Sequence, residues 1–204
     1  MKRIFFSLII LLLVSCKKEV IVVKAVNKTK DTLSIKDIKF VSFGDKIISQ
    51  DNFISQIKNS TDIAYIRKNL SKIKFDYDQF NEWDFNTIEK KNIGDISLQL
   101  KREKADNSDA TICTHISLSI YKNNKKADKI IIYKNENYSE ALVVITRFFY
   151  INSDFDLWLL DINEDEEGIN FNSWNQYRID KNSGKINLIK SIKNNEIYNE
   201  ESNI

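Results

Sequence analysis

Residues 111–134 read Thr-Ile-Cys-Thr-His-Ile-Ser-Leu-Ser-Ile-Tyr-Lys-Asn-Asn-Lys-Lys-Ala-Asp-Lys-Ile-Ile-Ile-Tyr-Lys, and this stretch decides the fold. Its first half, residues 111–121, alternates apolar and polar side chains, which is typical of a β-strand with one buried face. Residues 123–125 are polar, and residues 128–134 (Asp-Lys-Ile-Ile-Ile-Tyr-Lys) follow them as the returning segment. The pattern therefore predicts two antiparallel strands joined by a tight turn.

Short predicted strands separated by brief polar turns continue on both sides of this hairpin. They are residues 20–26, 32–43, 95–101, 140–151, 156–162, 169–180 and 185–192. The segment 140–151 is apolar on both faces, which marks a central strand that is covered on both sides. Such closely spaced strands favour an antiparallel meander.

Helical spacing occurs only in the first half of the chain. Apolar residues recur every three or four positions in residues 63–73, and Ser60, Thr61 or Asp62 would cap the first turn. The spacing of Phe53, Ile54 and Ile57 predicts a second, shorter helix over residues 51–58. The expected fold class is α+β: one domain over residues 20–193, mainly an antiparallel β-sheet meander, with one or two helices packed on one face and a polar tail at 194–204.

The N-terminus carries an export signal. Lys2 and Arg3 precede an apolar run that is too short to span a bilayer comfortably, and the run ends in Leu13-Val14-Ser15-Cys16. These four residues resemble the lipobox of bacterial lipoproteins, with a composition similar to Bacteroidetes proteins. The resemblance implies a signal peptide at residues 1–15, lipid on Cys16 and a short tether at 16–19.

Sorting and charge add to this expectation. Lys17 follows the cysteine where aspartate would favour the inner membrane, so the resemblance implies the outer membrane, facing the periplasm or the cell surface. Loss of Lys2 and Arg3 removes the formal charge of +2. A neutral chain lacks the basic surface that nucleic-acid binding needs. We expect membrane attachment through Cys16, no nucleic-acid partner and no cofactor.

Cys113 and His115 are the first candidate for chemistry. They are two residues apart on a predicted strand, so their side chains point to the same side. There they could act as a nucleophile and its base, or as two metal ligands. Neighbours at this spacing lie about 6–7 Å apart, which is long for direct proton transfer. Zinc would need further ligands from distant carboxylates. We therefore expect ordinary strand residues, no catalytic group and no metal, and a Cys113–His115 hydrolase remains an alternative.

The acidic stretch 161–168 is the second candidate. Its alternating Asp161, Asn163 and Asp165 resemble the start of a calcium loop, but Glu166 stands where such loops need glycine and Asn172 stands where they need glutamate. A solvated hairpin turn between two strands fits better. The same four residues, Asp161, Asn163, Asp165 and Glu166, would make an anionic plug for a protein partner.

The aromatic stretch 75–88 is the third candidate. Tyr77 and Trp83 lie among carboxylates, as in sugar-binding sites, although we favour core packing because aromatic side chains bury large areas. The leading hypothesis is a non-catalytic envelope lipoprotein that binds a protein, as an inhibitor of a lysozyme-like hydrolase or as an immunity protein against a secreted toxin. The alternative is a glycan-binding, ligand-binding or envelope-assembly lipoprotein that uses the aromatic stretch.

Overall fold

The computed structural model describes residues 42–93, 95–104 and 110–194. The lipobox with Cys16, the strand expected at 20–26, nearly all of the strand expected at 32–43 and the tail from residue 195 lie outside the described residues. No helix within the described ranges is long and apolar enough to cross a bilayer.

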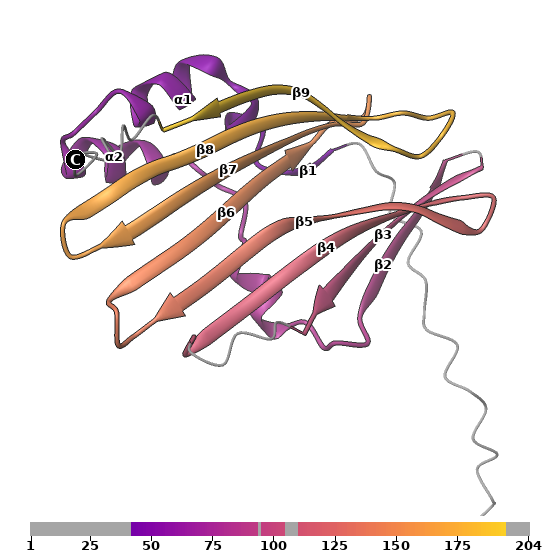
Figure 1. The fold of residues 1–204 in the computed structure, drawn as a ribbon, viewed down its shortest axis with the longest axis horizontal. Helices are drawn as coiled ribbons and strands as arrows, with labels where there is room; N and C mark the ends of the chain where they lie inside the picture. The colour runs from indigo at the N-terminus through magenta and orange to yellow at the C-terminus, as the bar shows by residue number, and fades with distance from the viewer. Residues whose placement is uncertain (1–41, 94, 105–109, 195–204) are drawn as a thin grey trace, which may run out of the picture. The chain divides into compact units, whose positions relative to one another are not determined.

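Antiparallel strands dominate the described part of the chain, in one nine-stranded sheet (Figure 1). The strands are β1 (Phe43–Gly44), β2 (Ile88–Ile93), β3 (Ile96–Glu103), β4 (Ile112–Lys122), β5 (Lys125–Tyr138), β6 (Val143–Ile151), β7 (Asp156–Asp165), β8 (Gly168–Ile179) and β9 (Ile186–Lys193). From β2 to β9 each strand pairs with the next along the chain. The α+β class and the antiparallel meander are therefore confirmed.

The hairpin of β4 and β5 forms as the sequence predicts. Asn123 and Asn124 have φ angles of 49° and 61°, the left-handed pair that a two-residue type I′ turn requires. The returning strand is longer than expected, because it begins at Lys125 and continues to Tyr138. Strand β2 was not predicted, since its sequence Ile-Glu-Lys-Lys-Asn-Ile is polar, as edge strands often are.

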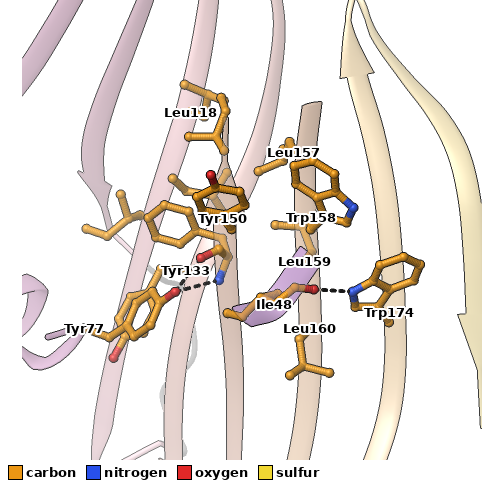
Figure 2. Close-up of a cluster of buried hydrophobic side chains, with 14 of the residues drawn as sticks. Ile48, Tyr77, Leu118, Tyr133, Tyr150, Leu157, Trp158, Leu159, Leu160 and Trp174 are labelled. Atoms are coloured by element: carbon orange, nitrogen blue, oxygen red, sulfur yellow. Dashed lines mark hydrogen bonds between the residues drawn. The ribbon is translucent and has the colours of Figure 1, made fainter. Parts of the chain in front are cut away.

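Both helices form where the apolar spacing predicts them. They are α1 (Asp51–Lys58) and α2 (Ile63–Leu70), and Asp62 caps α2 by accepting hydrogen bonds from the N–H groups of Ala64 and Tyr65. Each helix contacts β8. The short 3-10 helix η1 (Lys46–Ser49) precedes them, and the Trp174 indole N–H donates to the Ile48 carbonyl at 2.7 Å (Figure 2).

The sheet divides between β5 and β6. These strands pair only from Lys134 to Tyr138 with residues 143–147, and β1 then takes the place of β5 by pairing with Tyr150 and Ile151. Gly44 allows this approach, because a Cβ atom there would lie 2.2 Å from the Phe149 carbonyl oxygen.

The Tyr77 side chain lies where strands β5 and β6 separate, against Tyr133 of β5 and Phe149 of β6. Its hydroxyl donates to the Phe149 carbonyl and accepts from the Phe149 N–H, the two bonds drawn at Tyr77 in Figure 2. It also accepts from the N–H of Asp45. Its ring stacks on Tyr133 with centroids 5.6 Å apart. Burial raises the pKa of Tyr77 far above its ordinary value, so the hydroxyl keeps its proton.

Most of the aromatic stretch 75–88 packs into or against the core, as favoured from the sequence, although Phe85 is 41% exposed. Phe80, in the 3-10 helix η2 (Asp78–Glu82), is fully buried and contacts Phe43, Tyr133 and Phe149. These contacts join the segment before β2 to both halves of the sheet.

Tyr77→Phe tests the join between the two halves. Loss of the hydroxyl removes the bond to the buried Phe149 N–H, while the Phe149 carbonyl still accepts from the Asp45 N–H. An unsatisfied buried donor is expected to cost about 1–3 kcal/mol of unfolding free energy. Urea denaturation followed by circular dichroism measures it. Tyr65→Phe, at a tyrosine that is 42% exposed, is the matched control and should change little. Equal effects of the two substitutions would contradict this role of Tyr77.

Candidate functional site

Cys113, His115 and Glu136 converge on one side of the sheet. Cys113 and His115 lie two apart on β4, and Glu136 lies directly opposite Cys113 on β5. His115 Nε2 is 3.8 Å from the Cys113 sulfur and 2.6 Å from Glu136 Oε1. The side chains approach more closely than the strand spacing suggested, because the His115 ring turns toward both neighbours. One ligand atom from each residue lies within 4.8 Å of the others.

Glu136 is buried and fully partnered. Its second oxygen, Oε2, accepts from the Lys134 ammonium and from the Tyr138 hydroxyl, each at 2.9 Å. Burial by itself raises the pKa of Glu136, but the hydrogen bonds from Lys134, His115 and Tyr138 outweigh it and bring the pKa below its usual value. The carboxylate is therefore ionised at neutral pH.

This arrangement does not activate Cys113 as a nucleophile. His115 uses the same nitrogen toward both Cys113 and Glu136, whereas a catalytic base needs one nitrogen for the thiol and the other for its orienting carboxylate. Burial and the nearby Glu136 charge raise the pKa of the free Cys113 thiol. Few thiolates are then present at neutral pH. The geometry suits the alternative noted from the sequence, in which both side chains are metal ligands.

A second polar cluster crosses the neighbouring strands. The Arg147 guanidinium on β6 binds both carboxylate oxygens of Asp161 on β7, at 2.6 and 2.9 Å, and donates to the Ile131 carbonyl. The Ser173 hydroxyl on β8 also donates to Asp161. Burial disfavours the Arg147 charge, but the bonds to Asp161 outweigh it and raise the pKa of Arg147.

This cluster corrects the expected position of Asp161. The sequence suggested that Asp161 belongs to an exposed acidic turn, but β7 continues to Asp165, and Asp161 lies mid-strand, 8% exposed. Asn163 is also within the strand. The turn itself consists of Glu166 and Glu167, both exposed, since Asp165 pairs with Gly168. Of the four proposed partner-binding residues, only Glu166 lies at the tip.

The tip of this β7–β8 hairpin is held firmly. Asp165 Oδ1 accepts from the N–H groups of Glu167 and Gly168, at 2.9 and 3.0 Å. The Glu164 carboxylate, just before the turn, forms a 2.6 Å ion pair with Arg67 of α2. These contacts hold the backbone of the turn that carries the exposed Glu166 and Glu167 side chains.

Tyr77 and Trp83 do not form one exposed aromatic surface. Tyr77 is 5% exposed, and Trp83 is partly buried against Phe80. Tyr77 instead forms part of the wall of a cavity of about 340 Å³, together with Asp76, Asp78 and Tyr133. The rest of the lining is mixed polar and apolar, from Leu70, Ile73, Phe75, Asn135, Thr146 and Phe148.

Sequence reasoning missed Glu136 and Arg147 as partners in these clusters. The sequence did contain a signal for Glu136. Counting residues outward from the turn at Asn123 and Asn124 along both strands predicts which residues of β5 lie opposite Cys113, and the count comes within two residues of Glu136. Two bulges in the β4–β5 ladder shift that count, however, so the pairing of Glu136 with Cys113 follows only from the register in the structure. Arg147 did carry a signal, because a charge within a largely apolar strand needs a partner, but the sequence did not identify Asp161 as that partner.

Searches for similarity to protein-family models, to curated proteins and to solved structures found no match to this chain. The geometry of the described residues therefore carries the functional argument.

Asp161→Asn is expected to destabilise the fold, because it leaves the Arg147 guanidinium without its counter-charge. The expected loss is about 3 kcal/mol, near the lower end for a broken buried pair, since a quarter of the Arg147 side chain is exposed. Urea denaturation measures it. The control, Glu166→Gln, removes an exposed charge and should change the unfolding free energy by less than about 0.5 kcal/mol. If Asp161→Asn matches the control, the ion pair has no structural role.

Proposed function

We propose that this chain is a non-catalytic lipoprotein of the cell envelope that binds a protein partner through the tip of the β7–β8 hairpin. The lipid would be carried by Cys16, at the outer membrane. The partner class is a secreted toxin or a lysozyme-like hydrolase with a basic cleft, which makes this chain an immunity protein or an inhibitor.

The observation that supports this proposal is the pair of exposed carboxylates, Glu166 and Glu167, on a two-residue turn. Asp165 holds the turn from within, and the Arg67–Glu164 ion pair ties the hairpin to α2. A preorganised loop loses less conformational entropy when it binds. Carboxylates at its tip favour a partner surface of opposite charge.

We also propose that α1 and α2 pack together on one face of the sheet, next to the hairpin. The contacts of both helices with β8 support this arrangement. So do two charged contacts from separate helices, Arg67 with Glu164 and Asp51 with Lys190. The helices would then restrict the movement of the β7–β8 hairpin, to which we assign partner binding.

Affinity capture tests the partner. The full chain, immobilised through a C-terminal tag, is exposed to secreted and envelope fractions of its own organism and of competitors, and retained proteins are identified by mass spectrometry. One secreted hydrolase or toxin in near-equal amount is expected. Glu166→Lys combined with Glu167→Lys should reduce its capture at least tenfold, because like charges then meet a basic surface.

Glu140→Lys, in the exposed turn between β5 and β6, is the control; it reverses one exposed carboxylate away from the tip, half the charge change of the double variant, and should retain the partner. Capture that survives reversal of Glu166 and Glu167 would contradict the assigned surface. If the folded chain retains no such protein, the inhibitor hypothesis is wrong.

A second candidate function is binding of a small polar ligand, such as a sugar, in the cavity beside Tyr77. The cavity combines aromatic rings with amide, hydroxyl and carboxylate groups, which is typical of ligand sites. Burial and the nearby Asp78 carboxylate raise the pKa of Tyr133 to about 12, so its hydroxyl remains protonated at neutral pH.

Asp78→Asn tests this cavity. If a sugar binds there, calorimetric titration with envelope oligosaccharides should show saturable heat that Asp78→Asn reduces at least tenfold in affinity. Asp84→Asn changes an exposed aspartate of the same aromatic stretch that does not line the cavity, and should bind as the parent does. Equal affinity of the parent and Asp78→Asn would exclude this cavity as the ligand site.

A further inference from the structure

Three side chains of different chemistry converge at the start of β4. A thiol, an imidazole and a carboxylate come from Cys113, His115 and Glu136, and their ligand atoms lie within 4.8 Å of one another. Two of these residues are neighbours on one face of β4, and the third is the direct cross-strand partner of Cys113. The backbone ladder of two central strands therefore holds the group together.

From this convergence we propose that Cys113 Sγ, His115 Nε2 and Glu136 Oε1 form a binding site for a divalent transition metal of the zinc class. The proposal is independent of the partner-binding function, since it uses different residues and a different chemistry.

The distances suit one ion with small adjustments. Zinc binds sulfur at about 2.3 Å and imidazole nitrogen at about 2.0–2.1 Å in a tetrahedral arrangement, which places the two ligand atoms about 3.6 Å apart. The observed separation of Cys113 Sγ and His115 Nε2 is 3.8 Å. His115 Nε2 and Glu136 Oε1, at 2.6 Å, share a hydrogen bond that the ion would replace. These two atoms would move apart by less than about 1 Å to reach ligand spacing.

The surroundings prepare Glu136 to act as a ligand through one oxygen. Lys134 and Tyr138 both bind Oε2, which fixes the carboxylate and leaves Oε1 directed at His115. Outer partners of this kind orient metal ligands in proteins. The Lys134 ammonium also repels a cation, so we expect the metal to bind less tightly than it would without this lysine.

The donor set selects the kind of metal. Calcium and magnesium take six or more oxygen ligands, and this group offers one carboxylate oxygen beside nitrogen and sulfur. Thiolate and imidazole together favour zinc and similar ions. Cys113 and His115 are only partly buried, so solvent water can reach the fourth position of a tetrahedral ion.

Titration with cobalt(II), a spectroscopic substitute for zinc, tests the site. The full chain carries Cys16→Ser in every sample, so that Cys113 is the single thiol, and it is reduced and treated with a chelator before use. We expect one equivalent of cobalt(II) to produce thiolate-to-metal charge-transfer absorption and the visible bands of a four-coordinate ion. Zinc should then displace the cobalt and abolish both.

Substitutions identify the ligands. Cys113→Ser should abolish the charge-transfer band, and His115→Gln and Glu136→Gln should each weaken cobalt binding at least tenfold. Glu103→Gln is the matched control. Glu103 pairs with His115 from the other side, on β3, but its carboxylate binds Ser117 and Lys129, so this variant should bind as the parent does.

Two results would overturn the proposal. One is the absence of a charge-transfer band when the folded parent is titrated to millimolar cobalt(II). The other is a band that His115→Gln leaves unchanged, since the thiol would then bind metal without the proposed set. Circular dichroism establishes that each variant is folded. If Glu136→Gln does not fold, the cobalt titration of His115→Gln decides whether the site exists, because His115 is only partly buried and its substitution should leave the fold intact.

Discussion

The hydroxyl of Tyr77 is the interaction on which the rest of the structure depends. Strands β5 and β6 stop pairing after residue 147 of β6, and a sheet edge that opens inside a core would leave polar backbone groups without partners. Tyr77 bonds to both backbone groups of Phe149 and to the N–H of Asp45, which leads away from β1. One side chain thus joins the two halves of the sheet and the segment that fills the space between them.

The division of the sheet also sets where its polar clusters can lie. Where β5 and β6 still pair, Glu136 lies opposite Ile145, and Ile145 lies opposite Asn163. The group of Cys113, His115 and Glu136 is therefore at the same end of the sheet as the acidic hairpin tip. Beyond Arg147 the interior is filled by aromatic rings around Phe80. The cluster of Cys113, His115 and Glu136 thus lies at the continuous end of the sheet, and the aromatic cluster around Phe80 lies at the divided end.

Local patterns predicted the elements whose residues make their own contacts. The Asn123–Asn124 turn, the cap at Asp62 and the alternation in β4 depend on neighbours a few positions away, and each formed as expected. The predictions failed where an element depends on a distant partner. Strand β2 is polar and is held by pairing with β3. Asp161 was predicted in a turn because the sequence does not show that Arg147, on the neighbouring strand, pairs with it.

The sequence by itself determined the antiparallel class, the strand order implied by short turns and the two helices, because hydrophobic periodicity and turn chemistry act over a few residues. It also supplied the lipobox resemblance at Cys16, which remains a prediction. Only the tertiary structure decided that Glu136 meets Cys113 and His115, and that Asp161 is buried with Arg147. Those contacts depend on strand register and on bulges, and a shift of one residue turns a side chain to the opposite face.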